Sequence, residues 1–227
     1  MTTRHDEIAN ALENVQDRVL VAARNAGRRV DEITLIAVTK TYPVSDVAIL
    51  RQLGVENFAE NRDAEGAMKS KEVPGTWHFQ GQIQSNKLNS IATWADVVHS
   101  LDDMRHVLRL DRAVPKGKKI SVFIQVSLDE SPHRGGVEAL GLAPLAQSIL
   151  ESTNLQLKGL MAVAPLGENP ESAFARLALI HSDFCQQFPQ STSLSAGMSN
   201  DFETAIAYGA THLRIGSSIL GSRMDLL

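Results

Sequence analysis

One lysine of this sequence stands at the end of an apolar run, where it could react with an aldehyde. Lys40 follows Thr39 and the β-branched, almost continuously apolar run 33–38. Such a run is typical of a strand buried on both faces. Burial disfavours a charged ammonium group, which leaves a neutral amine that can condense with an aldehyde to a Schiff base. The structural alternative is a lysine that emerges at the strand end and pairs with a carboxylate.

Two later segments combine small residues with hydroxyl groups, a pattern that suits a phosphate. The first is Ser195-Ala196-Gly197-Met198-Ser199, after which Asn200 and Glu203 have the spacing of a helix capping box. The second is Arg214-Ile215-Gly216-Ser217-Ser218. Small residues let backbone amides approach a ligand closely, and hydroxyl groups add further donors. Ordinary turn chemistry is the alternative, because glycine and serine are common in loops.

Arg214 lies at the end of the strand-like run that precedes Gly216. A guanidinium group does not lose its proton near neutral pH. Set against a pyridine nitrogen, it donates a hydrogen bond and keeps that nitrogen unprotonated, which makes the ring a weaker electron sink. The alternative role is an ion pair across the mouth of the fold.

The elements that must position these residues alternate between strand and helix. Residues Arg4 to Ala26 carry an apolar stripe at helical spacing, which Gly27 closes. Eight short apolar runs follow, and we expect strands at 33–38, 55–59, 76–80, 96–99, 120–127, 156–162, 192–195 and 211–215. We expect helices at 44–53, 61–71, 85–93, 102–113, 138–152, 170–188, 200–208 and 218–225.

Strands that alternate with helices imply parallel βαβ units. Eight such units in about 195 residues predict a (β/α)8 TIM barrel with an extra N-terminal helix. A doubly wound open sheet is the alternative, but it usually has five or six strands. We find no linker or break in composition, so we expect a single domain over 1–227, with helix 1–27 packed on the barrel. In this fold the loops after strands seven and eight are a recurrent phosphate site.

Composition excludes several other functions. A net charge of −4 gives no reason to expect nucleic acid or a membrane surface as a partner. Cys185 is the only cysteine, so no intramolecular disulfide can form. His181 stands four residues before Cys185, without a third ligand nearby, and we expect no metal site. No secretory signal or membrane-length apolar run is present, so we expect a cytoplasmic protein.

With these motifs assembled, the sequence resembles the YggS/PROSC family of pyridoxal phosphate homeostasis proteins. The resemblance runs from about Ile33 to Arg223, nearly the whole chain. Each motif alone is weak, but six in the same order are highly specific. They are Ala37-Val38-Thr39-Lys40, Glu60-Asn61-Arg62, Trp77-His78-Phe79, Gln84-Ser85-Asn86-Lys87, Gly197-Met198-Ser199 and Arg214-Ile215-Gly216-Ser217.

The resemblance implies a barrel like the N-terminal domain of alanine racemase, with pyridoxal 5′-phosphate (PLP) held as an internal aldimine on Lys40. Arg214 then matches the arginine that faces the pyridine nitrogen. The phosphate-binding positions are matched by Ser199, Gly216 and Ser217. Three further residues fall in family motifs around the site: Asn61, His78 and Asn86. A histidine within a strand is also commonly a packing residue, and this alternative stays open for His78.

One detail of the loops remains open. Arg134 lies in the variant loop 131–136 after the fifth expected strand, where it could meet an incoming anion. The alternative for Arg134 is a solvated charge on a flexible loop.

The same resemblance favours a cofactor carrier over an enzyme, with PLP-dependent apo-enzymes as candidate partners. The alternative is a PLP-dependent amino-acid racemase, which needs acid–base groups on both faces of the ring. In the related racemase, the second group is a tyrosine from another subunit's extra domain. This chain has only Tyr42 and Tyr208 and leaves no room for that domain. We therefore predict no catalytic residues, negligible activity and a monomer.

Overall fold

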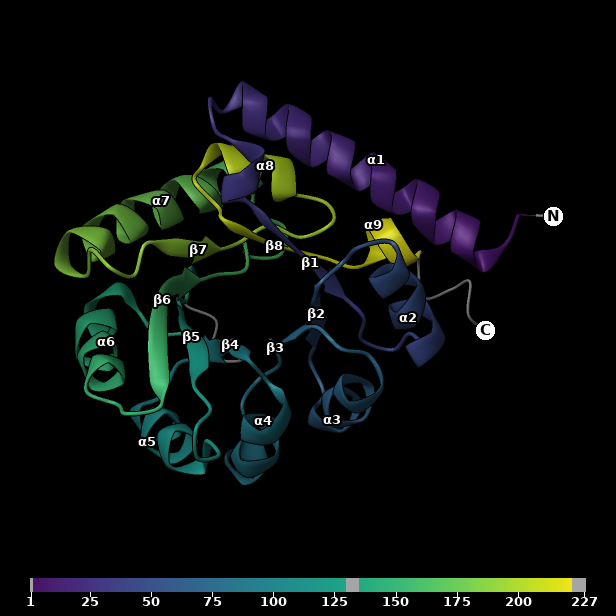
Figure 1. Cartoon of the computed structure of the whole chain (residues 1–227). Helices are drawn as coiled ribbons and strands as arrows, with labels where there is room; N and C mark the ends of the chain where they lie inside the picture. The colour runs from purple at the N-terminus through teal and green to yellow at the C-terminus, as the bar shows by residue number, and fades with distance from the viewer. Residues whose placement is uncertain (1, 130–134, 222–227) are drawn as a thin grey trace.

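Eight parallel strands close into a barrel, and helices surround it (Figure 1). The structure is a computed structural model that describes residues 2–129 and 135–221. Each strand pairs with the next along the chain, and β8 pairs with β1. The strands are β1 (Thr34–Val38), β2 (Asn57–Glu60), β3 (Thr76–Phe79), β4 (Val97–Leu101), β5 (Ile120–Gln125), β6 (Leu155–Met161), β7 (Ser193–Ser195) and β8 (His212–Ile215). The prediction of a (β/α)8 barrel with an extra N-terminal helix is confirmed.

The helices follow the expected order with small differences in their bounds. The α-helices are α1 (Arg4–Asn25), α2 (Val44–Gln52), α3 (Asp63–Glu72), α4 (Leu88–Trp94), α5 (Met104–Ala113), α6 (Leu142–Leu150), α7 (Pro170–Gln187), α8 (Phe202–Ala207) and α9 (Ser217–Leu220). The described residues also form three short 3₁₀ turns, η1 (Val30–Glu32), η2 (Ser85–Lys87) and η3 (Ala139–Gly141). Two expected helices thus begin as the 3₁₀ turns η2 and η3. The last expected helix extends to 225, and its part beyond 221 lies outside the described residues.

The expected capping box at Asn200 and Glu203 is wrong. Helix α8 begins after Asp201, whose Oδ1 accepts a hydrogen bond from the Met198 amide at 2.6 Å. The Glu203 carboxylate instead accepts a hydrogen bond from Arg18 of α1. The Glu203 side chain therefore binds a residue far away in the sequence and not the local backbone, as a capping box would require.

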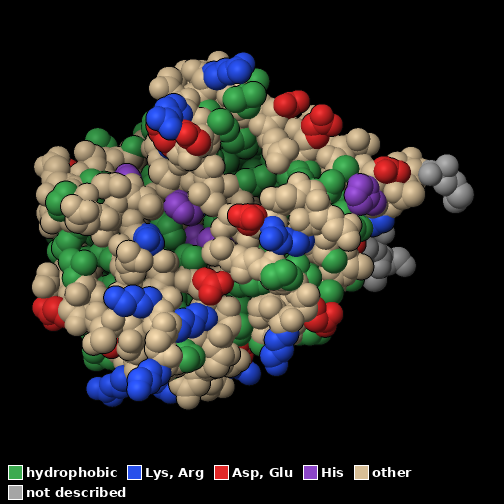
Figure 2. Space-filling model, in the orientation of Figure 1, with side chains coloured by type: hydrophobic (Ala, Val, Ile, Leu, Met, Phe, Trp, Pro, Cys, Tyr) green, Lys and Arg blue, Asp and Glu red, His purple; other side chains and the backbone are tan. Residues whose placement is uncertain are grey.

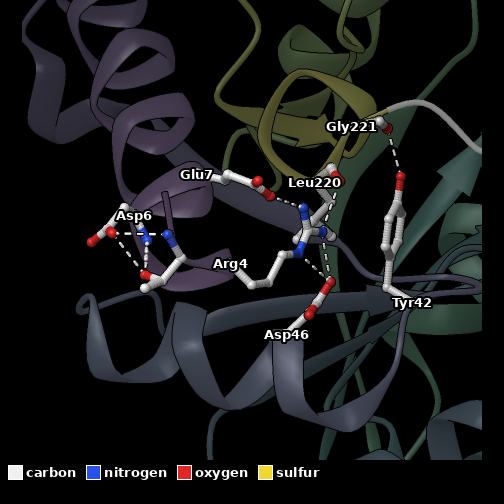
Figure 3. Close-up of polar contacts among 8 residues, drawn as sticks. Arg4, Asp6, Glu7, Tyr42, Asp46, Leu220 and Gly221 are labelled. Carbon is white, nitrogen blue, oxygen red and sulfur yellow. Dashed lines mark hydrogen bonds and ion pairs between the residues drawn. The ribbon is translucent and has the colours of Figure 1, made fainter. Parts of the chain in front are cut away.

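Helix α1 packs across α2, α8 and α9 on the outside of the barrel (Figure 1). Its first turn is fixed by a capping box between Thr3 and Asp6. An apolar stripe beginning at Ile8 is buried beneath it. Figure 3 shows how Arg4 joins three helices, because it donates to Asp46 of α2 and to the Leu220 carbonyl of α9 at 2.7 and 2.9 Å.

The barrel interior is unusually polar for this fold, in which bulky branched residues ordinarily fill the centre. Two small apolar clusters remain apart from the main core: Ile36, Val38 and Ala59, and Val97, Phe123 and Met161. The buried polar side chains of the strands include His78, His99, Ser195 and Arg214. Figure 2 shows histidine side chains near the centre of the face in view, with charges of both signs around it. Among the described helices, none combines the length and apolar character that crossing a membrane requires.

Candidate functional site

A cavity of about 480 Å³ opens among the loops that follow the strands. Its walls come from the end of β1, from the loops after β6 and β7, and from the end of β8. Five of the predicted site residues line it: Lys40, Ser199, Arg214, Gly216 and Ser217. A larger hollow of about 780 Å³ lies between α1, α7 and α8, outside the barrel. We assign the function to the smaller cavity, because it lies at the carboxyl ends of the strands, where barrels of this kind carry their chemistry.

The turn that carries Lys40 has a strained backbone. Thr41 has a φ of 73°, and no other described residue except glycine has a positive φ. This conformation is unfavourable for a β-branched residue and persists only when its surroundings enforce it. The Thr41 amide donates to Glu65 Oε2 at 2.9 Å, and the Tyr42 amide donates to the Thr39 carbonyl at 3.1 Å. These bonds fix the backbone on both sides of Lys40, whose side chain is half-buried.

A buried ion pair supports the same turn from within the fold. The Lys69 side chain is only 2% exposed, and its Nζ donates to Glu60 Oε1 at 2.6 Å and to the Thr39 carbonyl at 2.8 Å. Its third partner is Glu65 Oε2 at 3.4 Å, so the ammonium group has an acceptor for each proton. Burial raises the pKa of the Glu60 carboxyl, while the hydrogen bonds from Lys69 and Thr39 act in the opposite direction. Helix α3 is thereby tied to the turn that presents Lys40.

The loops after β7 and β8 meet at the cavity. The Ser218 amide donates to Ser199 Oγ at 3.2 Å, which joins the two loops directly. Gly197 has a φ of 90°, and a Cβ there would lie 2.9 Å from the Cα of Phe202. At Gly216 a Cβ would lie 3.1 Å from the Val38 carbonyl oxygen. The two glycines thus permit a close approach of loop backbone that brings Ser199, Gly216 and Ser217 to one cavity.

Arg214 enters the cavity from β8 and is 4% exposed. Its Nη1 donates to Ser195 Oγ at 2.7 Å, and its Nη2 donates to the Ala162 carbonyl at 3.0 Å. Burial lowers the pKa of Arg214 to about 10, against the opposing charge of Asp201. The guanidinium therefore stays charged at neutral pH.

Two histidines continue the hydrogen bonds of Arg214 through the barrel. His99 Nδ1 lies 2.9 Å from Ser195 Oγ, and His99 Nε2 lies 2.8 Å from His78 Nδ1. His78 Nε2 lies 3.1 Å from Asn57 Oδ1. Burial lowers the pKa of His78 to about 3 and that of His99 well below 6.5. Both imidazoles are therefore neutral at physiological pH.

The remaining predicted site residues lie away from the cavity lining. His78 lies inside the barrel, Asn61 is half-buried between β2 and α3, and Asn86 is exposed in η2. Their contact with a cofactor stays a prediction. The side-chain oxygen Oδ1 of Asn61 is buried without a hydrogen-bond partner among the described residues. Arg134 lies outside the described residues.

The described residues contain no group of three or more side chains that could hold a metal ion. His181 Nε2 and Cys185 Sγ lie 3.4 Å apart on α7, without a third ligand.

The supporting roles of four residues were not predicted from the sequence: Ser195, His99, Glu60 and Lys69. Ser195 stood in a recognised small-residue segment, but its partner His99 shares no sequence spacing with it. Lys69 lies on a helix with many charges, where a solvated side chain is the ordinary expectation. Only the closed barrel brings these residues together.

The fold and the cavity define a class: (β/α)8 barrels with a lysine after the first strand and an arginine at the end of the eighth. A family model described as alanine racemase, N-terminal domain, matches residues 11–224. A pyridoxal phosphate homeostasis protein of Mycobacterium leprae is 39% identical over 240 residues, covering 96% of this chain and 93% of its own. The protein of the same name from Escherichia coli is 36% identical over 232 residues, covering 96% and 97%.

The chain therefore belongs to the alanine racemase N-terminal domain family and, within it, to the pyridoxal phosphate homeostasis proteins. This confirms the resemblance found in the sequence. A solved structure of PipY from Synechococcus elongatus, with PLP bound, superimposes with a TM-score of 0.82 at 30% identity. That match covers 94% of this chain and 100% of PipY.

Proposed function

We propose that this chain binds PLP through a Schiff base on Lys40 and serves PLP homeostasis without turning over an amino-acid substrate. The observation that carries the proposal is the shared cavity of Lys40, Arg214 and the loops after β7 and β8. The names of the relatives and the PLP-bound PipY structure support it. We further propose apo-enzymes as recipients of the cofactor, a monomeric chain and a cytoplasmic place of action.

The donor set of the cavity fits the chemical groups of PLP. Lys40 supplies an amine for the aldehyde, and Arg214 supplies a donor for the ring nitrogen. The hydroxyl groups of Ser199 and Ser217, with the backbone at Gly216, suit the phosphate. The volume of about 480 Å³ lies within the usual range for small-molecule sites.

The chain's own residues would hold the cofactor and limit its reactivity. PLP supplies an aldehyde that condenses reversibly with amines. Lys40 would hold the cofactor through its Nζ, the amine that this lysine brings to the cavity lining. Arg214, whose pKa of about 10 keeps it charged at neutral pH, would donate to the ring nitrogen and leave that nitrogen unprotonated. A pyridine ring with an unprotonated nitrogen is a weak electron sink. This property suits a carrier that does not turn over a substrate.

The contacts of the two tyrosines argue against either of them as the second base that racemisation requires, although Tyr42 lines the cavity. The Tyr42 side chain is 6% exposed, and its hydroxyl donates to the Gly221 carbonyl at 2.5 Å (Figure 3). Tyr208 lines the outer hollow between α1, α7 and α8. These positions support the carrier over the racemase.

The binding test is the visible absorption of a Schiff base after incubation with PLP. We expect the band in the wild-type protein, its loss in Lys40→Ala, and its retention in Lys71→Ala, which changes an exposed lysine of α3. No band in the wild-type protein, or a full band in Lys40→Ala, would overturn the proposed binding mode.

The non-enzymatic part of the proposal needs its own measurement. We expect no sustained exchange of amino-acid α-protons into deuterium oxide by the PLP-loaded protein, followed by NMR over a panel of amino acids. Turnover that depends on Lys40 would show an enzyme instead.

A further inference from the structure

A line of hydrogen bonds crosses the barrel interior from Arg214 to Asn57, through Ser195, His99 and His78. We propose that Ser195, His99 and His78 are positioning residues that hold the buried Arg214 guanidinium charged and aimed at the ligand, by donating their protons in one direction, away from Arg214. This inference rests on the proposed function, since it assigns the residues that govern the ring-nitrogen side of the same site.

The direction of the protons follows from the chemistry of the first link. Arg214 has only donors, so Ser195 Oγ accepts from it. The Ser195 hydroxyl proton then has His99 Nδ1 as its acceptor at 2.9 Å, the other partner of this oxygen in the described part of the chain. A neutral imidazole that accepts at Nδ1 carries its proton on Nε2.

The same logic fixes the next two links. His99 Nε2 donates to His78 Nδ1 at 2.8 Å. His78, accepting at Nδ1, carries its own proton on Nε2 and donates to Asn57 Oδ1 at 3.1 Å. Every link has one donor and one acceptor, and no imidazolium is needed. Burial, which lowers the pKa of both histidines, favours this neutral arrangement.

This arrangement lowers the electrostatic free-energy cost of burying the Arg214 guanidinium. A buried guanidinium usually needs a carboxylate in contact with it. Among the described residues, the direct partners of Arg214 are instead the Ser195 hydroxyl oxygen and the Ala162 carbonyl oxygen. A chain of aligned dipoles directs its negative ends toward the cation, and the alignment strengthens each bond. Arg214 therefore keeps its charge without a carboxylate in direct contact, while the charge of Asp201 acts on it from a distance.

The functional result of this arrangement is that Arg214 keeps N–H donors that no group in the described part of the chain uses. A guanidinium has five N–H groups in a fixed fork. Two of them are used by Ser195 and Ala162, and Arg214 lines the cavity beside Lys40. The remaining donors can meet a ring nitrogen. The histidines cannot relay a proton from the Arg214 end of the chain of hydrogen bonds, because arginine does not release a proton near neutral pH.

The direct test measures the imidazole tautomers by long-range ¹H–¹⁵N NMR on the full chain, before any cofactor is added. We expect both His78 and His99 to be neutral near pH 7, with the proton on Nε2. A proton on Nδ1 of either ring, or an imidazolium, would overturn the chain.

The second test measures the ring nitrogen in protein loaded with ¹⁵N-labelled PLP. We expect an unprotonated nitrogen in the wild-type protein and a shift toward the protonated form in Ser195→Ala, with affinity for PLP reduced roughly tenfold. The matched control is Ser191→Ala, because Ser191 is a buried serine whose hydroxyl donates only to the Leu157 carbonyl. Identical ring-nitrogen signals in all three proteins would contradict the assignment.

Two variants of His99 keep the test valid if Ser195→Ala fails to fold. His99→Leu removes the acceptor of the Ser195 hydroxyl and should reproduce the ring-nitrogen shift. His99→Asn places a carbonyl oxygen near the former Nδ1 and should restore the wild-type signal. Equal signals from the Leu and Asn variants would overturn the role of His99.

The two proposals fail differently. Absence of a Schiff-base band in the wild-type protein overturns PLP binding on Lys40, whatever the tautomers are. A normal band with the wrong tautomers, or with no effect of Ser195→Ala, leaves PLP binding intact and overturns the positioning chain.

Discussion

Thr41 has the unusual backbone of the site, and it directly follows the residue that we assign to cofactor binding. Its φ of 73° lies in the left-handed region, which a β-branched residue enters at a cost on the order of 1–3 kcal/mol. The Glu65 carboxylate accepts a hydrogen bond from the Thr41 amide and holds the backbone in this conformation. The position of Lys40 therefore depends on strain that the neighbouring residues maintain.

Comparing two substitutions of Thr41 tests this strain. Glycine adopts a positive φ without steric cost, whereas alanine does not. We expect Thr41→Gly to be more stable to urea than Thr41→Ala by about 1 kcal/mol, the reverse of their order in ordinary structure. An alanine variant as stable as the glycine variant would show that the turn relaxes without cost.

At the scale of elements, the Glu60–Lys69 pair connects helix α3 to the turn between β1 and α2. Glu60 is fully buried at the end of β2, and Lys69 reaches it from α3 at 2.6 Å. The pair also takes the Thr39 hydroxyl and carbonyl into the same network. A buried pair of this kind is sensitive to the loss of one partner, because the other charge is left without compensation.

Removing only Lys69 should therefore be far worse than removing both charges. We expect Lys69→Met to lower the free energy of unfolding by about 3–5 kcal/mol, measured by chemical denaturation. Adding Glu60→Gln should recover a large part of this loss, because glutamine is uncharged and still accepts from Thr39.

The control for this pair is Lys71→Met, which changes an exposed lysine on the same helix and should leave stability nearly unchanged. Equal losses in the single and double variants would show that Lys69 matters for packing rather than for charge.

At the scale of the whole molecule, the buried histidines couple the stability of the barrel to pH. The folded protein holds His78 neutral down to a pKa of about 3, whereas an unfolded chain binds the proton near 6.5. Below about 6.5 the unfolded state therefore holds more protons than the folded state, so stability falls as the pH falls. His99, whose pKa is also lowered by burial, acts in the same direction.

Chemical denaturation at about pH 7 and about pH 5 measures this coupling. Each histidine contributes a slope of up to about 1.4 kcal/mol per pH unit in this window. We expect His78→Gln to reduce the loss of stability between the two pH values by up to that amount per unit. A variant with the wild-type pH dependence would show that His78 already titrates in the folded state.

The sequence predicted the barrel because each strand is a local apolar run and each helix a local periodic one. The strands expected at 96–99 and 192–195 form as β4 and β7, although β7 has only the residues Ser193–Ser195. Boundaries were less predictable where tertiary contacts override local signals. Glu203 shows this, because its partner Arg18 lies on a helix at the other end of the chain.

The cavity residues were predictable because the barrel brings the ends of all strands to one edge. For Lys40 and Arg214, the position at a strand end indicated a place in the site, and the family motifs supplied their expected roles. The alternation of side chains along a strand does not show how deep in the barrel each side chain lies. The position of His78 inside the barrel, away from the cavity lining, could therefore not be predicted. The partner of a buried charge, such as Lys69, depends on the three-dimensional fold and leaves no local pattern.

The most direct test of the account is the identity of the residue that carries PLP. Reduction with borohydride fixes a Schiff base as a stable amine, and mass spectrometry of the digested protein then identifies the modified lysine. We predict one adduct per chain, on the peptide that contains Lys40, and its loss in Lys40→Ala. An adduct spread over the exposed lysines, or carried by a single lysine other than Lys40, would contradict the account.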